Sequence, residues 1–127
     1  MILVDTSVWI ELLRGTLGAT VSDEDLARFA TCGAILQEVL QGQDWGAEPA
    51  AFRANLLALP RLSDPLPFGL FLEGAEIFRL GRRKGYTIRS SIDCLIAAIA
   101  IANRVPVWHR NRDFAAIARY TGLECFR

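Results

Sequence analysis

The stretch ILVDTSVWI, residues 2–10, decides the fold class. Its first three residues are apolar and two of them are β-branched, which is typical of a strand buried in a parallel sheet. Asp5, Thr6 and Ser7 follow directly, and each can cap the start of a helix. The stretch therefore predicts a short buried strand that leads straight into a helix ending near Gly15.

The rest of the chain repeats this alternation of short apolar strands and helices. Further strands are predicted at 30–32, 61–62, 105–108 and 123–126. Helices are predicted from residue 22, at 34–41, from Pro49 to residue 59, at 68–83, at 92–103 and at 113–120. Strands that alternate with helices predict an α/β fold, in which helices cover both faces of an open parallel sheet.

The composition favours a globular protein, because 52% of the residues are hydrophobic and 22% are charged. A chain of 127 residues fits one domain, which we expect to span residues 1–127. The longest apolar run, 92–102, contains Asp93 and is shorter than the roughly 18 residues of a membrane span. Without a signal-peptide pattern, and with 3 scattered cysteines, the chain is expected in the reducing cytoplasm.

The net charge of zero conceals two oppositely charged halves. Residues 1–78 hold 4 basic and 11 acidic side chains, whereas residues 79–127 hold 10 basic and 3 acidic ones. Halves that stay apart in space could steer an anionic ligand, and halves that interleave could not. The basic residues of 79–89 likewise form either a rail for phosphates or a solvated helix end that complements the helix dipole.

Three carboxylates stand where such a fold places its ligand site. Asp5 follows the first strand, Asp113 follows the strand at 105–108, and Asp93 lies in the first turn of the apolar helix. These ends meet at one edge of a parallel sheet. Each acid alone could simply cap its helix. Together they would repel one another unless a cation such as Mg²⁺ lay between them, so a metal site is predicted here.

Glu38 is a different case, because its helical pattern does not place it in the site. The apolar residues around it form the buried stripe of the helix at 34–41. Glu38 points away from that stripe, as an exposed glutamate would.

Four segments of the chain resemble the PIN-domain family, and more narrowly its VapC-type toxins from toxin–antitoxin pairs. They are ILVDTSVWI at 2–10, LQEVLQG at 36–42, SIDCLIAA at 91–98 and NRDF at 111–114. The resemblance implies a three-layer α/β/α sandwich around a short parallel sheet. It also implies an endoribonuclease that hydrolyses RNA phosphodiester bonds with Mg²⁺ or Mn²⁺.

The same resemblance assigns roles to individual residues. It implies that the catalytic acids and metal ligands are Asp5, Glu38, Asp93 and, at the family's more variable fourth position, Asp113. Glu38 would then face a cleft, contrary to its helical pattern, and the hydroxyl of Thr6 would support the site.

The last motif leaves two points open. Many relatives carry a second acid where this chain has the uncharged Asn111, so one or two metal ions remain possible. Arg112, in the same motif, is a candidate contact for the substrate. Trp108, which lies just before this motif in the sequence, either stacks on an unpaired RNA base or belongs to the core.

The resemblance also implies partners, namely RNA, a cognate antitoxin and a second copy of the chain in a homodimer. The alternative is a PIN-fold module that binds antitoxin and DNA and has little or no nuclease activity. A haloacid-dehalogenase-type phosphatase is disfavoured, because no second aspartate stands two residues after Asp5.

Overall fold

The strand β1, Ile2–Val4, is the inner strand on which the fold is built, and all three of its side chains are buried. The structure is a computed structural model that describes residues 1–42 and 50–126. Over this range the sheet has the order β2–β1–β3–β4, with every neighbouring pair parallel. The other strands are β2 (Phe29–Ala30), β3 (Val107–Trp108) and β4 (Cys125–Phe126).

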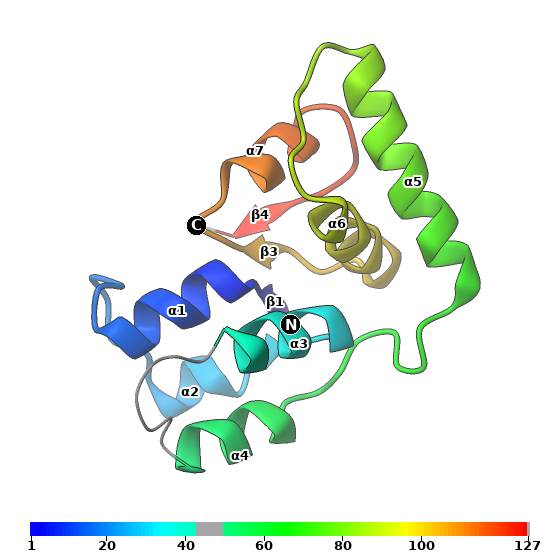
Figure 1. Ribbon diagram of the computed structural model, residues 1–127. Coiled ribbons are helices and arrows are strands. Elements are labelled where there is room, and N and C mark those ends of the chain that lie inside the picture. Colours follow the sequence, from blue (N-terminus) through cyan, green and yellow to red (C-terminus); the bar gives the residue numbers. More distant parts are fainter. Residues whose placement is uncertain (43–49, 127) are drawn as a thin grey trace.

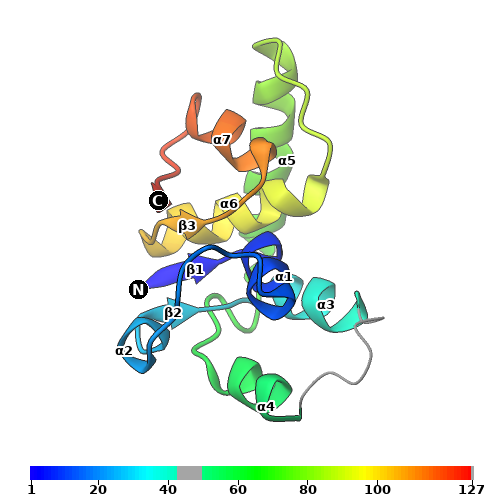
Figure 2. The ribbon, with the colours of Figure 1, turned by 90° about the vertical axis from the view of Figure 1, so that its left-hand side faces the viewer.

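Helices lie on both sides of this sheet, as Figures 1 and 2 show. The strands lie between α1 on one side and α6 on the other, and α5 packs on the outer side of α6. The predicted three-layer α/β/α sandwich around a parallel sheet is therefore confirmed. The helices are α1 (Thr6–Arg14), α2 (Asp23–Leu26), α3 (Gly33–Gln41), α4 (Ala50–Ala58), α5 (Phe68–Arg83), α6 (Ser91–Asn103) and α7 (Arg112–Ala118).

Local sequence signals set the ends of the helices near the site. Asp5 caps α1, because its Oδ2 accepts a hydrogen bond from the backbone N–H of Ser7 at 3.1 Å. The helix ends at Gly15, whose φ of 71° is the left-handed conformation that glycine adopts without a steric cost. Ser90 caps α6 by accepting from the N–H of Asp93 at 3.3 Å.

Some predicted elements are shorter than expected. The N–H of Val105 donates to the carbonyl of Ala100 at 3.1 Å, which closes α6, so β3 begins only at Val107. The predicted strand at 61–62 is a single bridge between Thr31 and Arg61. Pro49, the predicted start of a helix, lies outside the described residues, and α4 is described from Ala50.

The core is one cluster of buried apolar side chains, drawn from the sheet and from both helical layers. The apolar helix α6 lies at its centre, with most of its side chains buried against the sheet or against α5. Among the described residues, no helix is long and apolar enough to cross a membrane.

The strand order also separates the two charged halves of the chain. Strands β1 and β2 belong to residues 1–78, and β3 and β4 belong to residues 79–127, so the halves meet between β1 and β3. Strand order reverses at this boundary, the place where open parallel sheets bind ligands.

Candidate active site

Four carboxylates converge at the carboxyl edge of β1 and β3. Asp5, Asp93 and Asp113 are buried, with 2%, 4% and 5% of their surface exposed, and Glu38 is half-buried on α3. Burial and, after it, the negative charges of Asp5, Asp113 and Glu38 together raise the pKa of Asp93 to about 7, against a hydrogen bond from Asn111 that lowers it. The structure therefore brings the other three predicted acids within electrostatic reach of Asp93.

Asp5 lies at the end of β1 with one oxygen held and the other free. Its Oδ2 accepts from the N–H and the hydroxyl of Ser7, at 3.1 and 2.6 Å. Its Oδ1 is buried and has no hydrogen-bond partner. A buried carboxylate oxygen without a partner is costly, and such atoms mark sites that take a ligand or an ion.

Ser7 is a site residue that sequence reasoning did not single out. Its hydroxyl donates to Asp5 and accepts from the backbone N–H of Arg110 at 2.9 Å, which ties the segment after β3 to the start of α1. The only signal in the sequence was its place two residues after a capping aspartate, which any exposed helix start can share.

Glu38 reaches the site from α3. The hydroxyl of Thr6 donates to its Oε1 at 3.1 Å. Burial raises the pKa of Glu38, and the charge of Asp5 adds to this effect, while the bond from Thr6 opposes it. Glu38 therefore faces Asp5 and Thr6, and the interpretation of its helical pattern as an exposed glutamate was wrong.

The β3–α7 end of the site is held by a hydrogen-bond network. Asn111 caps α7, since its Oδ1 accepts from the N–H of Asp113 at 2.9 Å, and its Nδ2 donates to Oδ2 of Asp93 at 2.8 Å. Asp113, which the sequence suggested as a helix cap, instead accepts from the backbone N–H groups of Arg89 and Ser90 at 3.1 and 3.2 Å. One oxygen of Asp113 thus anchors the loop that leads into α6.

The aromatic and basic residues near the site have mixed placements. Trp108 is buried and packs on Phe29 and Phe126, so it belongs to the core and cannot stack on RNA. Arg112 is exposed at the first position of α7, beside the acids. In the basic stretch, Arg79 pairs with Glu76 at 3.1 Å within α5, as a solvated helix end would.

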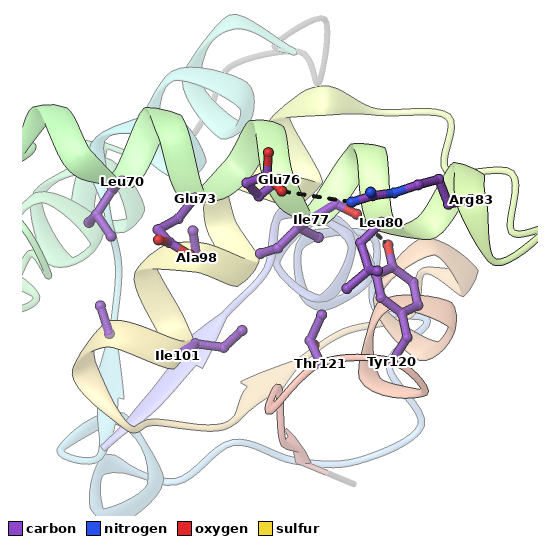
Figure 3. Close-up of a pocket in the computed structure, with 11 residues that line it drawn as sticks. Leu70, Glu73, Glu76, Ile77, Leu80, Arg83, Ala98, Ile101, Tyr120 and Thr121 are labelled. Atoms are coloured by element: carbon purple, nitrogen blue, oxygen red, sulfur yellow. Dashed lines mark hydrogen bonds and ion pairs between the residues drawn. The ribbon is translucent and has the colours of Figure 1, made fainter.

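An apolar cavity of about 400 Å³ lies apart from the carboxylates, between α5, α6 and the turn after α7 (Figure 3). Its lining includes Leu70 and Ile77 of α5, Ile101 of α6 and Tyr120, and none of the four acids contributes to it. The hydroxyl of Tyr120 donates to the carbonyl of Ile77 at 2.9 Å beside this cavity. The cavity therefore belongs to helix packing and not to the carboxylate chemistry.

Comparison with known proteins identifies the family. The model of the PIN domain matches residues 2–120. The chain belongs to the PIN-domain family. This PIN domain is 39% identical to ribonuclease VapC11 of Mycobacterium tuberculosis over 132 aligned residues, covering 98% of this chain and 96% of the relative. A VapC ribonuclease of Mycobacterium bovis gives the same identity and coverage.

Solved structures agree with this placement. The PIN domain matches VapBC-5 of Mycobacterium tuberculosis, a member of the VapBC family of toxin–antitoxin systems, with a TM-score of 0.63 and 27% identity over 98% of this chain and 96% of that one. It matches VapBC-1 of nontypeable Haemophilus influenzae with a TM-score of 0.64 over 99% and 97%; at 17% identity, that match shows the fold alone. The PIN domain is thus a VapC-type ribonuclease homologue of a toxin–antitoxin system, and such nucleases are hydrolases that are typically metal-dependent.

The acidic side chains at the site of this PIN domain are chemically suited to bind a divalent cation. All four acids offer hard oxygen atoms, and Oδ1 of Asp5 is buried without a partner. As they stand, no three histidine, cysteine, aspartate or glutamate side chains of residues 1–42 and 50–126 form a group that could hold an ion. Mutual repulsion keeps unneutralised carboxylates apart, and Asp93 and Asp113 are held by protein donors. The donor set fits in chemistry, and closing it around an ion requires these side chains to move together.

Proposed function

We propose that this chain is a metal-dependent endoribonuclease, in which Asp5, Glu38 and Asp93 hold Mg²⁺ or Mn²⁺ and Asp113 completes the acidic site. The observation that carries the proposal is Oδ1 of Asp5, a buried carboxylate oxygen without a partner among three further carboxylates. When bound, the cation supplies positive charge that offsets the charge developing on a phosphodiester in its transition state. The substrate class follows from the VapC ribonucleases to which the chain is similar.

The protein's own residues orient this site. Ser7 holds Oδ2 of Asp5 and so directs Oδ1 away from the cap. Thr6 holds one oxygen of Glu38, and Asn111 holds one oxygen of Asp93. Because neighbouring donors already restrain each carboxylate, little conformational freedom is lost when a substrate binds. Arg112, exposed beside the acids, is the candidate contact for an RNA phosphate.

The test compares wild-type protein with Asp5→Asn, which keeps the shape of the side chain and its capping oxygen but removes the charge. RNA cleavage is measured with Mg²⁺ or Mn²⁺ and again with EDTA. We expect EDTA to abolish cleavage, and Asp5→Asn to fold as the wild type does and to be inactive. The matched control is Asp23→Asn at the exposed start of α2, which should cleave normally. Full cleavage by a folded Asp5→Asn protein would contradict the proposal.

We propose further that the chain works with a cognate antitoxin and forms a homodimer. The solved relatives come from VapBC toxin–antitoxin systems. On α5 the side chains of Phe68, Phe71 and Leu72 are 74%, 51% and 57% exposed, which is apolar surface of the kind that protein partners cover. Light scattering on the purified chain measures its molar mass and so tests for the homodimer. The mass of a monomer at all concentrations would refute the homodimer. Co-expression of the chain with the product of an adjacent reading frame, followed by purification of the chain, tests whether the two proteins bind.

A further inference from the structure

The two ends of the acidic site, one at Asp5 and the other at the β3–α7 segment, differ in whether their carboxylate oxygens have hydrogen-bond partners. At the Asp5 end, Oδ1 of Asp5 is buried and without a partner. At the other end, Oδ2 of Asp93 accepts from Asn111 at 2.8 Å, and Oδ2 of Asp113 accepts from two backbone N–H groups at 3.1 and 3.2 Å. Only the Asp5 end therefore has an unsatisfied buried oxygen.

The amide of Asn111 has a defined orientation because both of its ends are bonded. Its Oδ1 accepts from the N–H of Asp113 at 2.9 Å while its Nδ2 donates to Asp93. Turning the amide over would place its –NH₂ against the N–H of Asp113 and its oxygen against a carboxylate. Two donors in a part-buried network and a carboxylate would then lose their partners, which is unfavourable for each group. The side of Asn111 that faces Asp93 is therefore a hydrogen-bond donor, which cannot ligate a cation.

We propose that this chain binds one divalent cation, at the Asp5 end of the site, and that Asn111 is the positioning residue that closes the Asp93–Asp113 end to a second. Asn111 does so by occupying Oδ2 of Asp93 with a donor and by adding no charge of its own. This inference rests on the proposed function and sets the stoichiometry of the same site. It also predicts that the number of bound ions depends on one side chain that contacts Asp93 directly.

The experiment counts Mn²⁺ ions per chain by titration, with free Mn²⁺ measured by electron paramagnetic resonance. Asn111→Asp is the decisive variant, because aspartate is an equally good helix cap and exchanges the donor for a carboxylate oxygen. The matched control is Asn55→Asp on α4, where the side chain is exposed and the same charge is added. We expect one Mn²⁺ per chain in the wild type and in Asn55→Asp, and two in Asn111→Asp.

Each result has a distinct meaning. Two Mn²⁺ ions in the wild type, or one in a folded Asn111→Asp protein, would overturn the inference and leave the proposed nuclease site intact. No bound Mn²⁺ in the wild type would overturn the proposed metal dependence itself, and this inference with it. If Asn111→Asp does not fold, the count in the wild type decides, since a second ion there refutes the inference by itself. A purely structural role for Asn111 would change the melting temperature of its variants without changing the number of ions.

Discussion

The substitution Asp93→Asn tests the electrostatic cost of the acidic site. Asp93 is 4% exposed and close to three other carboxylates, and these surroundings raise its pKa from the ordinary 3.8 to about 7. Without a bound cation, the folded protein therefore keeps a proton on Asp93 at pH values where the unfolded chain has lost it. Asparagine cannot ionise, and its oxygen can still accept the bond from Asn111, so the substitution removes this cost while keeping the contact.

The direction and size of the effect follow from the two pKa values. Below pH 3.8 both states are protonated and Asp93 costs nothing. As the pH rises towards 7, the unfolded chain binds fewer protons than the folded one, so the free energy of unfolding falls by about 1.4 kcal/mol per pH unit. Above pH 7 the loss is complete. Between pH 5 and pH 8 we expect Asp93→Asn to gain about 3 kcal/mol of stability relative to the wild type.

The assay is urea unfolding of both proteins at pH 5 and pH 8 in EDTA, with Asp23→Asn as the exposed control. Excess Mn²⁺ should then stabilise the wild type and not Asp93→Asn, by about 2.7 kcal/mol at a concentration of one hundred times Kd. The reasoning is refuted if the stability difference between Asp93→Asn and the wild type is the same at both pH values.

Two further predictions concern a single hydrogen bond and a close helix contact. Thr6→Val removes the hydroxyl that donates to Glu38 at 3.1 Å, and we expect a loss of about 1.5–3 kcal/mol in kcat/KM on RNA. Thr6→Ser should restore most of the lost kcat/KM. A Thr6→Val protein with the kcat/KM of the wild type would show that the bond does not contribute. Gly81→Ala places a Cβ 2.4 Å from the hydroxyl of Tyr120 and should destabilise the fold by about 1–3 kcal/mol in urea unfolding. Gly69→Ala in the same helix meets no atom within 4 Å and should be neutral or stabilising, so equal effects of the two would contradict the contact.

Much of the fold is predictable from the sequence, because its signals are local. The apolar run 2–4 and the cap at Asp5 predict β1 and the start of α1, and both are present. The bounds of α5 agree with the prediction, and those of α6 and α1 nearly so. The strands β3 and β4 are shorter than predicted. The first residues of each predicted strand instead form hydrogen bonds to the preceding helix or turn, and no residue pattern reveals these bonds.

The site was less predictable because its contacts are distant in sequence. Position at strand ends was enough to group Asp5, Asp93 and Asp113. Glu38 needed the family resemblance, because a helical pattern tells a buried face from an open one but cannot tell solvent from a cleft. The bond between Asn111 and Asp93 joins residues 18 positions apart, and its direction depends on a cap formed at the next helix. Such a network exists only after the sheet has formed.

The spacing of the four acids has a consequence for when the protein can act. Asp5 follows the first strand and Asp113 follows the third, and Asn111 reaches Asp93 only because β3 pairs with β1. No fragment that ends before residue 113 contains all four carboxylates. A nascent chain that has not reached residue 113, or a fragment that ends before it, therefore lacks part of the proposed site. Synthesis itself therefore delays the activity until residue 113 has been added to the chain.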